Sequence, residues 1–214
     1  MKRFTIGDAC ICWSLGETIE RETSATVLDI YRTLKEDRHL KAAGIRDIVP
    51  TYNGLAVHFD PADRELACTI RHIEGVMAEI LEGLEESAAR PRGNRLTLPV
   101  VYDGEDIRRV ADLNGLSRQE VVQFHTAATY TVAMVGFLPH FPYLIGLDPR
   151  LETPRMESPR TKVPAGAVAI GGAQTGIYPR PSPGGWNIIG STDPEGLREI
   201  QPGDTVIFRK VHEL

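Results

Sequence analysis

The chain has 214 residues and a formal net charge of −5, with 42% hydrophobic and 25% charged residues. This composition is typical of a folded globular protein and excludes wholesale disorder. The acidic balance argues against general nucleic-acid binding, which needs a basic face. No uncharged apolar run of about 18 residues occurs, so no membrane-spanning helix is predicted, and the charged N-terminus predicts no secretory signal.

Three cysteines are too few for a disulfide framework. Cys10 and Cys12 are two residues apart on a predicted strand, so their side chains share a face and are badly placed for pairing. Cys68 falls on a predicted helix. We expect reduced cysteines that pack as small hydrophobic residues in a cytoplasmic protein. No metal site is expected, because no His or Cys pair stands at ligand spacing near them.

The first half of the chain alternates between strand and helix patterns. Each predicted helix carries one apolar stripe, and the pair Asn53-Gly54 predicts a tight hairpin that uses positive φ angles. Strands are expected at residues 9–13, 45–49, 55–59 and 96–101, and helices at about 18–38 and 66–84. This order predicts a small ferredoxin-like α+β domain at residues 1–95, with a hinge at 88–94.

Two short helices are predicted within residues 105–125. Ser117 stands three residues before Glu120, which is the spacing of a capping box, and Leu116 and Val121 are placed to pack across it. His125 falls at or just past the end of the second helix, where the helix dipole favours a protonated ring.

The chain changes in character from residue 130 onward, where a half-buried strand is predicted at 130–135. Residues 136–190 hold 9 of the 20 glycines and 9 of the 15 prolines. Such a density excludes long helices and favours short strands joined by special turns, as in a small barrel or sandwich. Further strands are expected at 168–171, 176–178, 186–190 and 205–210.

Candidate binding chemistry gathers in three segments, residues 136–144, 154–160 and 171–186. Arg155 and Arg160 each follow a proline, which restricts the backbone and helps to direct each guanidinium group. Two such groups are suited to grip a carboxylate or a phosphate. The glycine-rich turns allow backbone N–H groups to approach a ligand closely.

Further side chains complete this candidate site. Gln174 and Tyr178 offer neutral hydrogen-bonding groups, and Trp186 offers a flat apolar wall. Each feature also has a plainer interpretation: an Arg after Pro as a solvated or structural cation, Trp186 as a core anchor, and His125 as a cap or a packed ring. The sequence has no P-loop, Gly-x-Ser-x-Gly elbow, His-Glu-x-x-His helix or Cys-x-x-Cys pair, so standard nucleophile and metal chemistries are unsupported.

A set of spaced motifs runs through the second half of the chain. It comprises residues 115–121, 125–126, 135–139, 141–144, 146–150, 154–155, 158–160, 163–166, 174–179, 182–186, 189–190 and 201–204. In these residues the chain resembles the family of the bacterial 5-oxoprolinase B subunit, which is also described as allophanate hydrolase subunit 1 and as the inhibitor of a sporulation histidine kinase. One departure is His140, which stands where the family usually has glycine; a positive φ there would carry some cost.

The resemblance implies a cyclophilin-like β-barrel at residues 96–214, a fold label that carries no prolyl isomerase activity with it. It implies a component that pairs with a homologous C subunit and works with an A subunit in an ATP-hydrolysing complex. That complex opens the lactam of 5-oxoproline to L-glutamate. ATP would be shared with a partner in the complex, and the isolated chain is expected to be inactive.

On this interpretation Arg155, Arg160 and His125 are the catalytic residues. The substrate is expected to contact His140, Phe141, Gln174, Tyr178, Pro183, Gly184, Gly185 and Trp186. Two alternatives remain open. One is a regulatory module that inhibits a sensor histidine kinase, and the other is an accessory component of an allophanate or urea amidolyase system. No nucleic-acid or membrane partner is expected.

Overall fold

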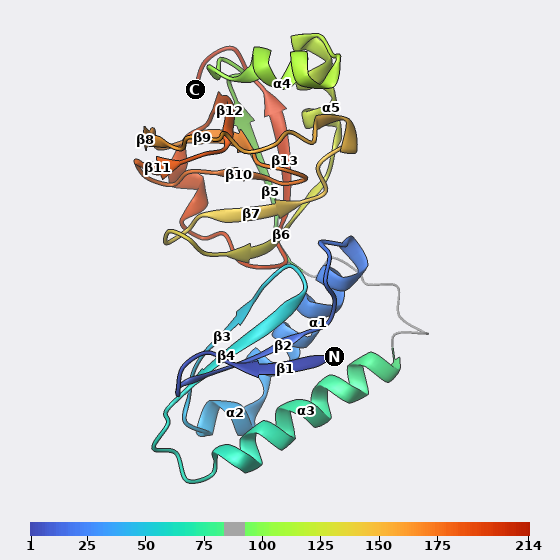
Figure 1. Ribbon diagram of the computed structural model, residues 1–214, viewed down its shortest axis with the longest axis vertical. Helices are drawn as coiled ribbons and strands as arrows, with labels where there is room; N and C mark the ends of the chain where they lie inside the picture. The colour runs from blue at the N-terminus through green and yellow to red at the C-terminus, as the bar shows by residue number, and fades with distance from the viewer. Residues whose placement is uncertain (84–92) are drawn as a thin grey trace. The chain divides into compact units, whose positions relative to one another are not determined.

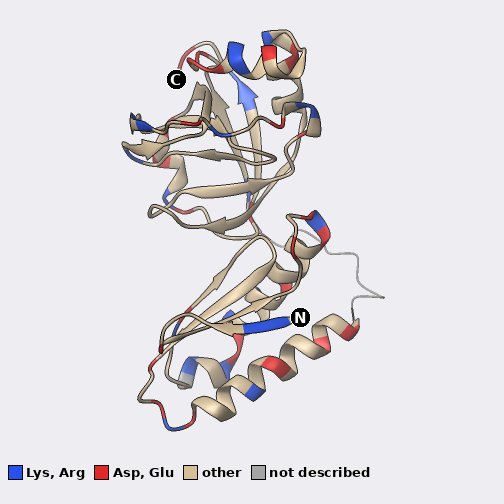
Figure 2. Ribbon diagram, in the orientation of Figure 1, with Lys and Arg blue, Asp and Glu red and all other residues tan. Residues whose placement is uncertain are grey.

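The computed structural model describes residues 1–83 and 93–214 (Figure 1). The chain divides into two compact units, Met1–Arg90 and Pro91–Leu214, each with its own hydrophobic core. Most of the predicted hinge at 88–94 lies outside the described residues. Acidic and basic residues are interspersed along the ribbon of each unit (Figure 2). No helix in the described ranges is long and apolar enough to cross a membrane.

The N-terminal unit is a four-stranded antiparallel sheet packed against helices. In pairing order the strands are β1 (Lys2–Thr5), β2 (Cys10–Ser14), β4 (Gly54–Phe59) and β3 (Ile45–Pro50), and the helices are α1 (Arg21–Glu36), α2 (Arg38–Ala42) and α3 (Leu66–Glu82). Alternate strand residues such as Trp13 and Val57 form a core with Ile30 of α1 and Ile73 of α3. The buried face of the sheet, to which every second strand residue points, therefore packs against the apolar stripes of α1 and α3.

The ferredoxin-like order predicted for this unit is not confirmed. The expected closing strand is β5 (Arg95–Val100), and it pairs in parallel with β13 (Thr205–Lys210) in the sheet of the other unit. Its apolar residues Leu98 and Val100 belong to that second core. The fourth strand of the N-terminal sheet is instead β1, paired with β2.

Local features of the N-terminal unit agree in part with the predictions made from the sequence. The β3–β4 hairpin forms where it is predicted, but Gly54 does not adopt a positive φ. Glycine is needed there because a Cβ would overlap the carbonyl oxygen of Trp13 on β2. Cys10 and Cys12 are buried and unpaired, with sulfur atoms 3.9 Å apart, whereas Cys68 is exposed on α3.

The C-terminal unit is built on a seven-stranded sheet that curls into a nearly closed barrel (Figure 1). In pairing order its strands are β12 (Asn187–Ser191), β9 (Ala167–Ile170), β10 (Thr175–Ile177), β7 (Pro142–Ile145), β6 (Tyr130–Val135), β13 and β5. Just beyond β5, Val101 exchanges backbone hydrogen bonds of 2.9 and 2.8 Å with Ser191 of β12. These bonds join the two edges of the sheet, and they confirm a barrel-like fold of mixed α and β structure.

The barrel sheet is apolar on both faces. Val168 and Ile170 of β9 point into the barrel core, whereas Ala167 and Ala169 belong to a second cluster on the opposite face. That cluster includes Val163 of β8 (Arg160–Val163), which pairs with β11 (Ser182–Gly184). The small β8–β11 pair therefore covers the outer face of the sheet, and the residues between the two layers are buried from both sides.

Two short helices cover the barrel, as the sequence predicts. They are α4 (Ile107–Asn114), which packs on β12, and α5 (Arg118–Ala127), which packs on β13. The capping box is confirmed: the Glu120 backbone N–H donates to the Ser117 hydroxyl at 3.2 Å, and the Ser117 backbone N–H donates to the Glu120 carboxylate at 2.8 Å.

Candidate functional site

A pocket of about 310 Å³ lies against the outer cluster of the barrel sheet, beside the β8–β11 pair. It is lined by Phe137, Phe141, Tyr143, Arg155, Met156, Pro159, Tyr178, Pro183, Gly184, Gly185 and Trp186. All eleven come from the three segments at 136–144, 154–160 and 171–186 that the sequence singles out. The fold therefore brings these separate segments to one place.

Phe141 lies at the centre of the aromatic wall of this pocket. Its ring centroid is 5.1 Å from that of Tyr178 and 5.7 Å from that of Trp186, with the planes nearly perpendicular in both pairs. The ring of Tyr143 lies 4.8 Å away. Edge-to-face pairs at such separations are favourable. The wall is therefore formed by contacts within the chain itself.

Three glycines make room for these rings. A Cβ at Gly171 would lie 2.6 Å from ring atoms of Trp186, and a Cβ at Gly184 would overlap the Tyr178 hydroxyl. At Gly176 a Cβ would lie 3.0 Å from Trp186. These three glycines thus admit aromatic side chains, a role that the sequence pattern alone does not reveal.

Arg155 is the one charged side chain in the pocket lining. The carbon at the centre of its guanidinium lies 5.5 Å from the ring centroid of Trp186, within the range of a cation–π contact. The side chain is exposed, and it has no carboxylate partner among the described residues. Its charge is therefore free to meet an anion that enters the pocket.

Arg160 lies outside the lining and is bound to acidic side chains. Its Nη2 donates to both carboxylate oxygens of Asp106, at 2.6 and 2.7 Å, and its Nε lies 2.8 Å from a carboxylate oxygen of Glu105. The Asp106 carboxylate also accepts the backbone N–H of Ile188 at 2.7 Å. These contacts favour the plainer interpretation, in which Arg160 is a structural cation.

His125 also lies outside the pocket lining, in the barrel core. Its ring is fully buried and stacks on Phe208 with centroids 4.5 Å apart. Burial lowers the pKa of His125 from 6.5 to about 3, so the ring is neutral. The protonated ring expected at a helix end is therefore not found, because loss of solvent outweighs the helix dipole.

The hydrogen bonds around His125 define which ring nitrogen carries the proton. The Thr175 hydroxyl donates to the carbonyl of Ala169 at 3.0 Å, so it can only accept from His125 Nε2, 3.1 Å away. Nδ1 then carries the lone pair and accepts the Tyr102 hydroxyl at 2.7 Å. A fully satisfied buried ring of this kind ties α5 to β10, the strand that also carries Gly176.

Two other predicted substrate contacts are absent from the pocket lining. Gln174 is half-buried in the β9–β10 turn, where its backbone carbonyl accepts a hydrogen bond from the Gly171 backbone N–H at 3.0 Å. His140 is exposed in the β6–β7 turn with a φ of 67°, the positive value that a glycine adopts without strain. Phe141, Tyr178 and the segment 183–186 do line the pocket.

Four lining residues were missed from the sequence, namely Phe137, Tyr143, Met156 and Pro159. All four lie inside the three segments that the sequence analysis singles out. Their closeness in sequence to Phe141 or Arg155 is the signal that could have identified them. No group of three or more His, Cys, Asp or Glu within residues 1–83 and 93–214 is placed to hold a metal ion.

Known proteins share this architecture. Residues 1–199 match the family described as "Carboxyltransferase domain, subdomain C and D". The chain is 34% identical to the B subunit of 5-oxoprolinase from Bacillus subtilis (strain 168) over 97% of this chain and 92% of that protein. It is 36% identical to the B subunit of 5-oxoprolinase from Escherichia coli O157:H7, over 92% and 94% respectively.

A more distant likeness shows the fold alone. The crystal structure of the K. lactis urea amidolyase superposes with a TM-score of 0.77 at 19% identity, over 98% of this chain and 15% of that one. The extent of the family match and the two relatives above 30% identity confirm the resemblance seen in the motifs. The chain therefore belongs to the carboxyltransferase subdomain C and D family, and within it to the B subunits of 5-oxoprolinase.

Proposed function

We propose that the chain is one component of an ATP-dependent complex that opens the lactam of 5-oxoproline to L-glutamate, and that the pocket around Trp186 holds this substrate. The observation that carries the proposal is Arg155. It is a cation without a carboxylate partner among the described residues, 5.5 Å from an indole ring, in a pocket whose other lining residues are uncharged. Such a site suits a small apolar ring that bears one negative charge.

The proposed substrate fits this lining in charge and shape. 5-Oxoproline is a five-membered cyclic amide with a single carboxylate. The guanidinium of Arg155 would pair with the carboxylate, and the ring would pack on the aromatic wall. Burial raises the pKa of both Tyr143 and Tyr178, so their hydroxyls stay protonated at neutral pH and can donate hydrogen bonds to the amide oxygen.

The lining also explains why the isolated chain is expected to be inactive. It contains no carboxylate, histidine, lysine or thiol that could activate water or protonate a leaving nitrogen. His125 is buried elsewhere and Arg160 is held by Asp106. Groups for proton transfer would therefore come from partners, which we propose to be the homologous C subunit and the A subunit of 5-oxoprolinase.

ATP hydrolysis would drive the opening of an unstrained amide. The lining of the pocket does not fit a triphosphate, which carries several negative charges, because it offers a single cation. The sequence also has no P-loop. We therefore propose that the nucleotide is held mainly by the partners in the complex, and that this chain contributes the binding and orientation of the cyclic amide.

The test is 5-oxoproline-dependent release of ADP and glutamate by the purified chain, alone and together with candidate C and A subunits. L-Proline, which has the same ring and carboxylate but no amide, is the matched control compound. The proposal predicts release only from the mixture and only with 5-oxoproline. No release in any combination would overturn it, and it would favour the regulatory interpretation. Rapid turnover by this chain alone would contradict the need for partners.

A further inference from the structure

The loop between β6 and β7 bends through two turns that are unfavourable for its residues. The Leu138 backbone N–H donates to the carbonyl of Gly136 at 2.8 Å, across Phe137, whose φ is 66°. This is a three-residue γ-turn of the positive-φ type, which is rare and strained. A large aromatic residue rarely adopts this region of backbone space.

The second turn follows immediately. The Phe141 backbone N–H donates to the carbonyl of Leu138 at 3.1 Å, and between them lie Pro139 and His140 with a φ of 67°. Proline at the second position and a positive φ at the third define a type II turn, whose third position normally takes glycine. The loop is thus strained at two non-glycine residues.

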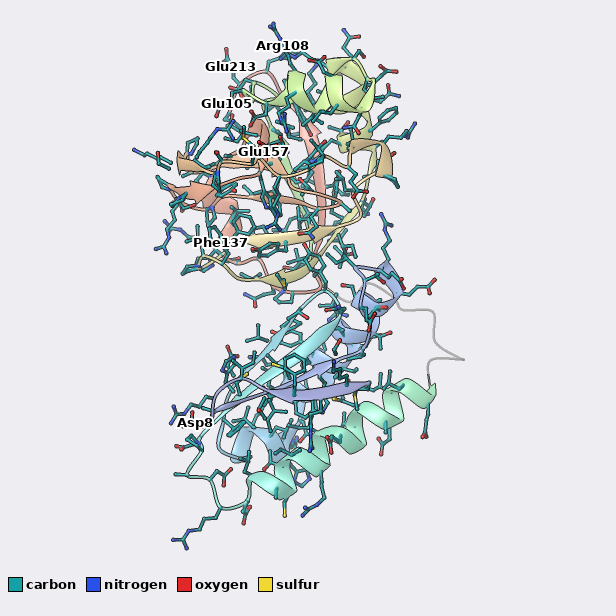
Figure 3. All side chains as sticks on the ribbon, in the orientation of Figure 1. Asp8, Glu105, Arg108, Phe137, Glu157 and Glu213 are labelled. Carbon is teal, nitrogen blue, oxygen red and sulfur yellow. The ribbon has the colours of Figure 1, made fainter. Side chains whose placement is uncertain are left out.

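The strained loop places Phe137 at the pocket. Phe137 lies near the tip of the β6–β7 hairpin (Figure 3), is 62% exposed and lines the pocket. Its ring meets that of Phe141 edge to face at 5.6 Å, whereas Phe141 itself is buried. An exposed apolar ring and a strained backbone are both unfavourable for the chain alone. Strain of this kind gathers at ligand sites, where a bound molecule can offset it.

We propose that Phe137 is a specificity-determining residue whose ring packs on a cyclic amide bound in the pocket and so favours it over the open-chain product. This rests on the proposed function. A compact ring offers a face for stacking, whereas glutamate is a flexible chain with no such face. Phe137 thereby helps the site to retain substrate and release product.

The test compares Phe137→Asn, Phe137→Tyr and the control Leu113→Asn in the reconstituted complex. Leu113 is 54% exposed on α4 and is not in the pocket lining. Asparagine accepts a positive φ more readily than phenylalanine does, so Phe137→Asn should leave the melting temperature unchanged or raise it. Its KM for 5-oxoproline should rise about tenfold with the inhibition constant of L-glutamate unchanged. Phe137→Tyr keeps the ring face, so its KM should stay closer to that of the wild type than the KM of Phe137→Asn does. The control Leu113→Asn should match the wild type.

The possible failures are distinct. If the wild-type complex turns over 5-oxoproline and Phe137→Asn keeps the wild-type ratio of glutamate inhibition constant to KM, the role of Phe137 is wrong and the proposed function stands. A fall in melting temperature in Phe137→Asn but not in Phe137→Tyr, with KM unchanged in both, would show a merely structural ring. If the wild-type complex does not turn over 5-oxoproline at all, the proposed function fails and the inference fails with it.

Discussion

Arg160 and Asp106 form an ion pair in which one guanidinium nitrogen lies 2.6 and 2.7 Å from the two carboxylate oxygens. The two side chains are only 20% and 9% exposed. Because Arg160 begins β8 and Asp106 immediately precedes α4, the pair ties the segment 154–160, which contributes to the pocket lining, to the start of α4. Of the two arginines in the segment 154–160, Arg160 therefore supports the pocket and Arg155 lines it.

This ion pair should contribute strongly to stability. Asp106→Asn leaves the Arg160 guanidinium partly buried without its main partner, so the free energy of unfolding should fall by about 3 kcal/mol. The matched control is Arg198→Gln, which breaks a pair whose side chains are 70% and 63% exposed and should cost less than about 1 kcal/mol. Urea denaturation measures both. Equal losses of unfolding free energy in the two variants would show that the buried pair stabilises the protein no more than the exposed pair does.

The sequence predicted more of the elements than of their long-range pairing. Strong periodicity located α3, and β6 and β13 were placed at their observed bounds. In the C-terminal unit the sequence does not predict β7, β8 and β11, because three or four residues among prolines and glycines carry no pattern of their own. Their formation depends on partners that are distant in the sequence.

Contacts between residues distant in the sequence also limit what could be predicted of the candidate site. Arg155, Tyr178 and Trp186 line the pocket, as local motifs indicated. The surroundings of Arg160 and His125 could not be predicted, because they are determined by partners 54 and 50 residues away along the chain. Only the folded barrel shows that Asp106 neutralises Arg160 and that the sheet buries His125.

Acid should weaken the barrel through His125. The folded state excludes a proton that the unfolded state binds, since the pKa is about 3 when folded and near 6.5 when unfolded. The contribution of the neutral ring to the free energy of unfolding is therefore fully present above about pH 6.5. It is lost as pH falls toward 3, at up to about 1.4 kcal/mol per pH unit. His125→Gln removes this titration. Denaturation at pH 7.5 and pH 5 should show a smaller pH dependence in the variant than in the wild type, whereas equal dependence would contradict a buried neutral ring.

A methyl group at Gly171 should displace the indole wall. An alanine Cβ there would lie 2.6 Å from Trp186, so Gly171→Ala should lower the free energy of unfolding by about 1–3 kcal/mol. Gly136→Ala is the control, because nothing lies within 4 Å of its Cβ position and its φ is not positive. Thermal unfolding and tryptophan fluorescence would measure both effects. Unchanged spectra and stability in Gly171→Ala would show that the wall is not tightly packed.

The three cysteines should differ in reactivity. Burial, followed by the nearby Cys10 sulfur, raises the pKa of Cys12 to about 11, whereas Cys68 is exposed on α3. Alkylation requires the thiolate, so iodoacetamide at pH 8 should modify Cys68 first and produce a single adduct by mass spectrometry. Cys68→Ser should abolish that adduct. Rapid modification of Cys12 in the folded protein would contradict its burial.

Whether Arg155 holds the carboxylate of the substrate is tested most directly by the KM for 5-oxoproline of a reconstituted complex that carries Arg155→Gln. Arg180→Gln is the matched control, since Arg180 is near in the sequence and does not line the pocket. Loss of a charge-assisted pair of about 2–3 kcal/mol predicts a rise in KM of roughly 30- to 150-fold for Arg155→Gln, with Arg180→Gln unchanged. A KM for Arg155→Gln equal to that of the wild type would contradict this role of Arg155 and the substrate site built around it.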